Sequence, residues 1–275
     1  MNLFNLSEIE RELIFQKRPS SKIKSPYVSD AVDKNGNSFL VHTPGLGLGG
    51  QYSSGDIITA TQSNPKSKTD YAMQCVDVTE DGYSKVTVGA NPAFAEKIAS
   101  EVLKRKLIKN YSAYNLINKP KEYKYNGDLY LKSNDSIIGV EVKNVVCATY
   151  DPNKKIDRKD SVFYDKSLPF KRSGIYPNGV LSQKWNSKPV VSSRSLLQLD
   201  KMVRLKEEGY KFLVMFIVNR GDCDTFKPNW QRDKEYSKML NKAHNAGVDI
   251  QAVGIEWKMG ICKYKSILTV DLKEW

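Results

Sequence analysis

Residues 128–143 read DLYLKSNDSIIGVEVK, and this stretch decides how the second half of the 275-residue chain folds. Two apolar runs with alternating side chains flank a polar segment, which predicts two strands joined by a short turn. On the second strand the apolar side chains share one face, while Glu141 and Lys143 share the other. Asp128 points away from the leucines of the first strand. The hairpin therefore brings Asp128, Glu141 and Lys143 together over an apolar floor.

Two carboxylates beside an ammonium group are the set that a metal-dependent phosphodiesterase requires, so the hairpin favours a nuclease. A Glu-x-Lys triplet taken alone is a weak motif, because such charges commonly keep an exposed strand edge soluble. The opposite face of this strand is rich in Val and Ile, as expected of a central strand. Twelve residues lie between the upstream acid and Glu141, which also suits a hairpin.

The charge of the chain points to a polyanionic partner. It has 43 Lys and Arg against 31 Asp and Glu, a formal net charge of +12. Residues 1–88 hold 9 basic and 10 acidic side chains, whereas the remainder holds 34 basic and 21 acidic ones. This excess favours nucleic acid before an anionic membrane, and places the basic surface in the part that contains Glu141.

Cysteine and histidine usage argues against other classes of site. The four cysteines form no CxxC pair and suggest neither a zinc site nor a disulfide framework, and two histidines are too few for a His-rich metal centre. No apolar run reaches membrane-spanning length, and the first residues lack the layout of a signal peptide. We expect a soluble protein without a membrane partner, in the cytoplasm or another intracellular compartment that contains nucleic acid.

The first 88 residues are predicted to form an OB-like β-barrel domain. Short strand-like runs (SFLVHT, DIITATQ, YAMQCVDV and KVTV) alternate with Gly, Pro, Asn and Asp turns. The Gly-rich segment PGLGLGG (44–50) lacks the Lys-Ser/Thr ending of a phosphate loop, and we interpret it as a turn.

Residues 89–275 alternate between helix and strand patterns, which predicts an α/β domain. A helix starts near Asn91, with Pro92 in its first turn and apolar side chains at helical spacing. Further helices are predicted at 193–209 and 235–247, and strands at 211–218 and 248–257. The run KFLVMFIV (211–218) is apolar throughout, as expected of a strand buried on both faces.

A polar insertion, residues 151–192, interrupts this domain. It carries 9 basic and 4 acidic side chains together with aromatic residues. Lys171 and Arg172 are its candidate nucleic-acid contacts, because cations bind phosphates while rings stack on bases. A surface loop without a binding role is an equal alternative.

The chain resembles the sugar fermentation stimulation protein A (SfsA) family. The resemblance runs, in the order of the family, through SNPKSKTDYAMQCV (63–76), NPAFAEKI (91–98), YNGDLYL…GVEVKNV (125–145), SRSLLQLDKMVRLKEEGYKFLVMFIVNR (193–220) and DKEYSKMLNKAHNAGVDIQAVGI (233–255). It implies an N-terminal OB-like domain and a PD-(D/E)xK (restriction-endonuclease-like) α/β domain with a central mixed sheet. It also implies nucleic-acid binding and metal-dependent nuclease activity.

Position by position, Asp128, Glu141 and Lys143 match the acid and the Glu-x-Lys of the family. Glu96 matches the upstream acid, and Arg194 the arginine that opens the next helix. The chain departs from the family pattern in three places, which affect substrate positioning more than the metal site. First, Leu196, Leu197 and Gln198 stand where the family has basic and His residues after the arginine. Second, the proline- and glycine-containing loop near residue 43 is altered to TPGLGLGG. Third, the insertion at residues 151–192 is long.

Applied to this chain, the resemblance predicts a site for Mg²⁺ or Mn²⁺, which prefer hard oxygen ligands. Asp128 and Glu141 would ligate the ion, with the Val142 carbonyl and Glu96 completing its shell. Lys143 would orient the attacking water or stabilise developing charge, and both roles stay open. Gln198 would contact the water or a phosphate, although an ordinary helix-surface amide is an equal interpretation.

Lys66 and Lys68, on a turn of the barrel domain, are predicted to bind the phosphate backbone without sequence preference. DNA and RNA, single and double strands, and internal and terminal cleavage all fit the pattern, as does any oligomeric state. Two other functions fit too: a DNA-binding regulator with an inactive nuclease core, and a basic surface that binds an acidic protein.

Overall fold

The computed structural model describes residues 1–6, 10–44, 51–134, 136–157 and 161–275. The chain divides into two compact units. Unit 1 comprises Met1–Phe94, Asn219–Asp222 and Ile255–Lys265, and unit 2 comprises Ala95–Val218, Cys223–Gly254 and Ser266–Trp275. The domain boundary between residues 88 and 89 stays a prediction. Residues 45–50 of the glycine-rich segment lie outside the described residues, so its interpretation as a turn also stays open.

Unit 1 is built around short antiparallel strands separated by turns. Its strands are β1 (Asn2–Asn5), β2 (Glu10–Lys17), β3 (Val28–Val32), β4 (Ser38–His42), β5 (Ile57–Gln62), β6 (Tyr71–Val78) and β7 (Val86–Gly89). The predicted runs at 38–43, 56–62, 71–78 and 85–88 coincide with β4, β5, β6 and β7 to within a residue at each end. β1 pairs with the first residues of β18 (Ile261–Val270), which also belong to unit 1.

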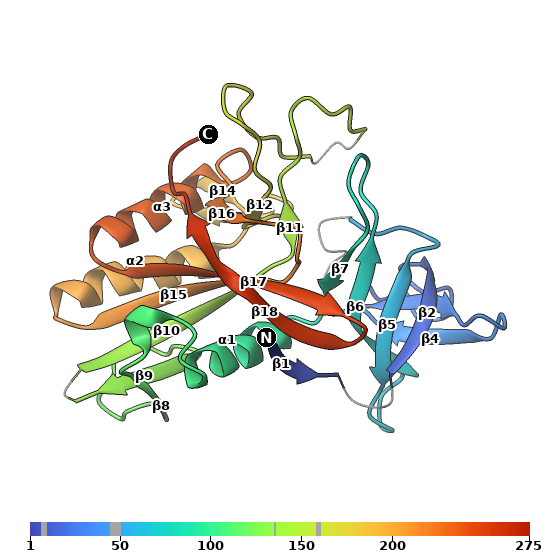
Figure 1. Cartoon of the computed structure of the whole chain (residues 1–275), viewed down its shortest axis with the longest axis horizontal. Helices are drawn as coiled ribbons and strands as arrows, with labels where there is room; N and C mark the ends of the chain where they lie inside the picture. Colours follow the sequence, from blue (N-terminus) through green and yellow to red (C-terminus); the bar gives the residue numbers. More distant parts are fainter. Residues whose placement is uncertain (7–9, 45–50, 135, 158–160) are drawn as a thin grey trace. The chain divides into compact units, whose positions relative to one another are not determined.

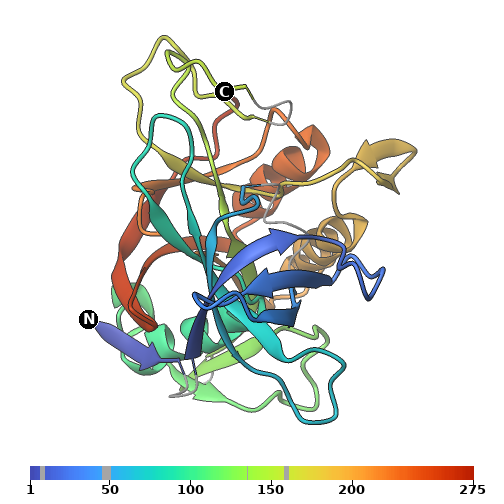
Figure 2. The same ribbon diagram turned by 90° about the vertical axis from the view of Figure 1, so that its right-hand side faces the viewer.

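Five of these strands close into the predicted OB-like barrel. Their order is β4-β3-β2-β5-β6, and a parallel pairing of β4 with β6 completes the circle (Figure 2). Numbered along the chain, the barrel strands follow one another as 1-2-3-5-4, with the third and fifth parallel, as in an OB-like Greek-key barrel. Leu13, Val41 and Ile58 point inward and are at most 1% exposed, so apolar side chains fill the barrel.

Unit 2 follows the α/β pattern (Figure 1). Its elements, with the strands that continue into unit 1, are α1 (Ala93–Lys104), a 3-10 turn (Lys109–Tyr111), β8 (Asn115–Ile117), β9 (Leu129–Ser133), β10 (Ser136–Val145), β11 (Cys147–Ala148), β12 (Ser173–Tyr176), β13 (Gln183–Trp185), β14 (Lys188–Val190), α2 (Ser193–Glu207), β15 (Lys211–Val218), β16 (Thr225–Pro228), α3 (Lys234–Asn245), β17 (Asp249–Lys258) and β18.

The central sheet is mixed, with the order β11-β12-β16-β18-β17-β15-β10-β9-β8. β8, β9 and β10 form an antiparallel meander, and β15 then runs parallel to both β10 and β17. Helix α1 precedes the meander and α2 connects β10 to β15, which is the αβββαβ order of the predicted restriction-endonuclease-like domain. The fold class predicted from the sequence is confirmed.

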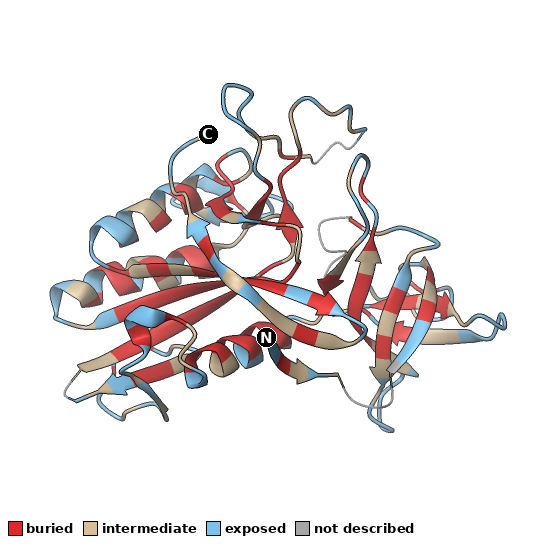
Figure 3. Cartoon of the chain, in the orientation of Figure 1, coloured by how far each residue is buried: buried red, intermediate tan, exposed pale blue. Residues whose placement is uncertain are grey.

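Both faces of the central strands are covered. Every residue of β15 after Lys211 is buried, and β10 is buried over most of its length (Figure 3). Val214 and Phe216 belong to a core that also includes apolar side chains of α2 and α3. Glu141 and Lys143 are in register with these two residues, so they point toward the same helical layer. The charged face, which a Glu-x-Lys triplet taken alone would place in solvent, is therefore an interior one.

Local capping explains where the helices begin and end. The Ser192 side chain accepts a hydrogen bond from the Ser195 amide at the start of α2, and Asp233 accepts one from Tyr236 at the start of α3. The Asn91 side chain accepts one from the Ala93 amide and caps α1, as predicted. Gly209 has a φ of 90° directly after α2, a conformation that glycine adopts without strain.

The insertion at residues 151–192 is more ordered than its polar composition indicates. It contributes β12, which pairs in parallel with β16, and the β13–β14 hairpin. Tyr164 stacks on Trp275, and the Lys227 ammonium lies 4.4 Å from the centroid of the Tyr164 ring. At least one aromatic side chain that we predicted to face bases is thus engaged within the protein.

All four cysteines are free thiols in buried positions. Within the described part of the chain, no helix has both the length and the apolar character needed to cross a bilayer.

Candidate active site

Asp128 is held against β10 at the start of β9. Its backbone amide donates to the Val140 carbonyl (2.9 Å), and its Oδ2 accepts from the Val142 amide (2.7 Å). A Cβ atom on Gly127 would lie 2.8 Å from the Val140 carbonyl oxygen, so glycine is needed for this close approach. The hairpin brings the Asp128 carboxylate to the edge of the strand that carries Glu141, as the sequence predicted.

Glu141, Lys143 and Gln198 form a closed network between β10 and α2. Lys143 Nζ donates to Glu141 Oε1 and to Gln198 Oε1, each at 2.7 Å, and Gln198 Nε2 donates to Glu141 Oε1 at 2.5 Å. Glu141 is 3% exposed and Lys143 is 8% exposed. A Glu–Lys pair on a solvated strand edge would be exposed, so burial excludes that interpretation of the triplet.

Tyr125 is a fourth member of this network that the sequence did not single out. Its hydroxyl donates to Glu141 Oε2 at 2.6 Å, and its side chain is buried. Burial and the negative charge of Glu141 raise the pKa of the Tyr125 hydroxyl, which keeps it a donor. No local pattern in KYNGD reveals this contact, because the acceptor lies sixteen residues away on another strand.

The electrostatics of Asp128 show that negative charge is crowded at the site. Loss of solvent around the carboxylate, followed by repulsion from Glu141, raises the pKa of Asp128 to about 6. The charge of Glu96 on α1 acts in the same direction, while the Val142 amide and Lys143 act in the opposite one. The residue as a whole stays exposed, so one side of it faces solvent.

The donor chemistry of this cluster fits a hard divalent cation. Asp128 Oδ1 and the second lone pair of Glu141 Oε2 are not used by the hydrogen bonds described above. The carbonyl and the amide of Val142 point to the same edge of β10, and the amide donates to Asp128. The last residue pair between β9 and β10 is Leu129–Val140, so Val142 lies beyond the paired part of the two strands. Among the described residues no three of the His, Cys, Asp and Glu side chains already converge on one point.

The remaining candidate residues of unit 2 come from α1, from the start of α2 and from the insertion. Glu96 is exposed on α1, and Arg194 is exposed in the first turn of α2, one turn before Gln198. Lys171 is exposed, but Arg172 is 6% exposed and its Nε donates to the Thr149 carbonyl. Its burial and this bond make Arg172 part of the protein interior, against its predicted contact with nucleic acid.

Lys66 and Lys68 belong to unit 1. Both are exposed in the turn between β5 and β6, where the Lys66 amide donates to the Asn64 side chain. This turn connects the fourth and fifth strands of the barrel, one of the two loops with which OB folds bind oligonucleotides.

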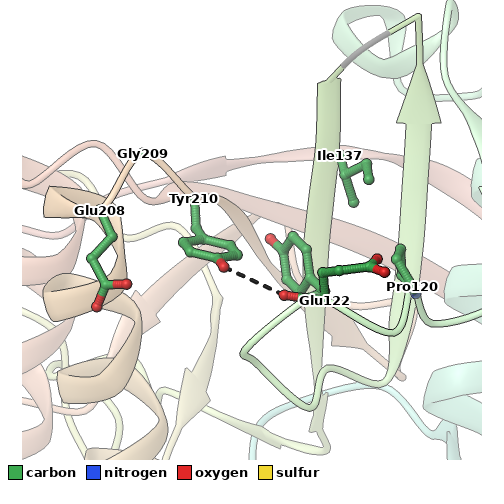
Figure 4. Close-up of a pocket in the computed structure, with 7 residues that line it drawn as sticks. Pro120, Glu122, Ile137, Glu208, Gly209 and Tyr210 are labelled. Atoms are coloured by element: carbon green, nitrogen blue, oxygen red, sulfur yellow. Dashed lines mark hydrogen bonds between the residues drawn. The ribbon is translucent and has the colours of Figure 1, made fainter.

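A separate hollow of about 340 Å³ opens at the other end of β10 (Figure 4). Its lining residues are Pro120, Glu122, Tyr123, Ile137, Glu208, Gly209 and Tyr210. Glu208 pairs with Lys124, and Tyr210 donates to the Glu122 carbonyl. Ile137 precedes Glu141 by four residues, about 13 Å along the strand, so this hollow is distinct from the candidate active site.

Comparisons with known proteins agree with the fold. The profile of a family described as "Sugar fermentation stimulation protein RE domain" matches residues 190–260. A sugar fermentation stimulation protein homolog from Thioalkalivibrio sulfidiphilus is 25% identical over 90% of this chain and 91% of its own length. One from Trichodesmium erythraeum is 24% identical over 82% and 78%, respectively.

A third homolog, from Pyrobaculum arsenaticum, is 38% identical over 82 residues, which are 30% of this chain and 35% of that protein. Among solved structures, that of Pyrococcus furiosus SfsA in complex with Ca²⁺ superimposes with a TM-score of 0.73 at 19% identity. The superposition covers 98% of this chain and 99% of the other. At this low sequence identity, the similarity shows that the two proteins share a fold.

Proposed function

This chain belongs to the sugar fermentation stimulation protein (SfsA) family, and we propose that it is a divalent-metal-dependent nuclease. It would hydrolyse phosphodiester bonds of DNA, RNA or both, with little sequence specificity. The proposal depends on one observation: Glu141 and Lys143 are buried as a hydrogen-bonded pair, with the Asp128 carboxylate on the neighbouring strand. A protein gains no solubility from buried charges, so their presence argues for chemistry.

Asp128, Glu141 and the Val142 carbonyl would hold Mg²⁺ or Mn²⁺, and the exposed Glu96 would contribute directly or through water. When bound, such an ion supplies charge neutralisation at the phosphate and lowers the pKa of a bound water. The Pyrococcus furiosus SfsA structure is a complex with Ca²⁺, which supports a divalent cation for this chain, although Ca²⁺ is larger than either ion we propose.

The contacts of Lys143 support an electrostatic role over that of a general base. Two of its three N–H groups donate to Glu141 and Gln198, and as a donor the ammonium has no lone pair with which to accept a proton. The third N–H remains to orient a water or to stabilise a phosphate oxygen. Gln198 fixes Lys143 and Glu141 relative to each other, which supports a positioning role for its amide.

Nucleic acid is the substrate class that the surface supports. Lys66 and Lys68 lie in the turn that corresponds to a ligand-binding loop of OB folds, and Arg194 is exposed on α2, one turn before Gln198. Contacts of this type hold the sugar–phosphate backbone and carry no sequence information.

The test is a panel of labelled single- and double-stranded DNA and RNA incubated with Mg²⁺, Mn²⁺ or EDTA. We expect metal-dependent cleavage by the wild type, and a loss of at least about 100-fold in Glu141→Gln. Glu235→Gln, which changes a carboxylate on α3, should cleave like the wild type. Equal cleavage by Glu141→Gln and the wild type would refute the proposed site.

One observation favours a second function, that of a nucleic-acid-binding regulator without catalysis. In the described residues no preassembled group of three metal-ligating side chains exists, and three of the acceptor positions of Glu141 already have donors. This function predicts that the purified protein shifts nucleic acid on a gel yet cleaves none of the panel with either metal.

A further inference from the structure

Glu141 is oriented by hydrogen bonds to both of its carboxylate oxygens. Lys143 and Gln198 donate to Oε1, whereas Tyr125 alone of the described residues donates to Oε2. The terminal torsion of a glutamate is broad and roughly two-fold, so backbone position does not fix the plane of the carboxylate. Donors on both oxygens do fix it, because rotation of the plane would break hydrogen bonds on both sides at once.

Tyr125 is itself held from several directions. Its ring packs edge-on against Phe212, with centroids 5.2 Å apart, and its carbonyl accepts a hydrogen bond from the Tyr130 hydroxyl (2.9 Å). The Lys201 ammonium lies 5.9 Å from the ring centroid. Tyr125 is 2% exposed, so bulk solvent has little access to it. The donor is therefore preorganised before any ligand arrives.

We infer that Tyr125 is a positioning residue for metal binding: by donating to Glu141 Oε2 it would hold the carboxylate in an orientation that leaves the second lone pair of this oxygen available to a cation. This inference rests on the proposed function, because it takes Glu141 as a metal ligand. Hydrogen bonds to metal-ligating carboxylates orient the ligand, and their removal typically costs about 10–100-fold in metal affinity. Tyr125 does not touch the reacting atoms in this role.

The structure provides a matched control. Tyr236 is also fully buried in unit 2, and the charge of Glu141 acts on its hydroxyl. That hydroxyl has no hydrogen-bond partner in the described part of the chain. Tyr125→Phe and Tyr236→Phe thus remove the same atom from similarly buried rings, but only the first breaks a bond to Glu141.

The experiment is a calorimetric titration of MnCl₂ into the metal-free full-length protein, without nucleic acid. We expect Tyr125→Phe to bind Mn²⁺ about 10–100-fold more weakly than the wild type, and Tyr236→Phe to bind within about twofold of it. In the cleavage assay, excess Mn²⁺ should restore Tyr125→Phe to the wild-type maximum rate, because positioning acts on binding. A merely structural role would not respond to metal concentration.

The outcomes separate the inference from the proposed function. A wild type that binds no Mn²⁺ overturns the metal site itself. A wild type that binds Mn²⁺, together with a Tyr125→Phe variant of equal affinity, overturns only the role of Tyr125. Thermal unfolding of both variants without metal verifies folding. If Tyr125→Phe unfolds early, the Mn²⁺-induced rise in its melting temperature replaces calorimetry, and a rise equal to that of the wild type overturns the role.

Discussion

The pairing of Glu141 with Lys143 leads to a prediction about stability that requires no assumption about activity. The two side chains are 3% and 10% exposed, and Lys143 Nζ lies 2.7 Å from Glu141 Oε1. At this separation Coulomb's law gives an attraction of about 6 kcal/mol for an effective dielectric constant of about 20. Desolvation of both charges offsets a large part of this. We expect a net coupling free energy of about 3 kcal/mol.

The two single substitutions should differ in cost. Lys143→Met leaves the buried Glu141 carboxylate facing Asp128 with no cation between them, and we expect a loss of about 4–5 kcal/mol in the free energy of unfolding. Glu141→Ala leaves Lys143 with the Gln198 carbonyl oxygen and the attraction of Asp128, so we expect about 3 kcal/mol. The double variant removes both charges, so its cost should be well below the sum.

The wild type, the two single variants and the double variant form a double-mutant cycle. Urea unfolding of all four proteins, followed by tryptophan fluorescence in EDTA at about pH 8, measures the coupling free energy. The exposed pair Lys188–Glu235 has a similar separation of 2.8 Å, with side chains 58% and 23% exposed. Its cycle should give less than about 1 kcal/mol, because solvent screens it. Costs for Glu141 and Lys143 that add to within about 0.5 kcal/mol would refute the reasoning, since uncoupled sites behave in that way.

Further predictions concern metal, substrate and the insertion. Because the pKa of Asp128 is raised to about 6, protons should compete with Mn²⁺ below that pH. Calorimetry should show affinity falling about tenfold per unit below pH 6 and levelling above it, whereas a flat profile contradicts this. If Lys66 and Lys68 contact phosphates, each change to Ala should lower the salt slope of nucleic-acid binding by about 0.7–0.9 in anisotropy titrations, and unchanged slopes exclude contact. Arg172→Ala should cost about 1.5–3 kcal/mol in urea unfolding through the lost bond to a buried carbonyl, and Lys171→Ala less than about 0.5; equal costs would contradict the assigned burial.

The parts of the fold that were predictable from sequence are those that depend on local pattern. The period-two alternation around Glu141 and the apolar run at 211–218 predicted β10 and β15, because side-chain spacing reports strand geometry directly. Asn91 was predicted to cap the first helix, and its side chain accepts a hydrogen bond from the Ala93 amide. By contrast β12, with its four residues SGIY, is too short to show a period, and only its pairing with β16 makes it a strand.

The residues of the site that belong to one hairpin could be predicted from the sequence. Asp128, Glu141 and Lys143 lie within sixteen residues, so alternation alone brings them together. Gln198 is 57 positions from Glu141, and was found through its place in the family pattern. Tyr125 was missed because a buried hydroxyl shows its partner only in three dimensions. The burial of Glu141 was also missed, because a charged strand face usually indicates solvent and only the α2 layer decides otherwise.

The candidate site is negatively charged, whereas the whole chain is positively charged, and this difference affects how metal and nucleic acid would bind. Asp128, Glu141 and Glu96 carry three negative charges when ionised, against the positive charge of Lys143, within a chain of formal net charge +12. The net positive charge of the chain would attract a phosphate backbone, but the carboxylates would repel a phosphate that enters the proposed site. A divalent cation removes this repulsion, so metal and nucleic acid should each increase the affinity of the protein for the other. The anisotropy titrations, run with and without Mn²⁺ on Glu141→Gln and the wild type, measure this coupling: it should be present in the wild type and weakened in the variant, because the variant lacks one of the repelling charges and one ligand of the ion.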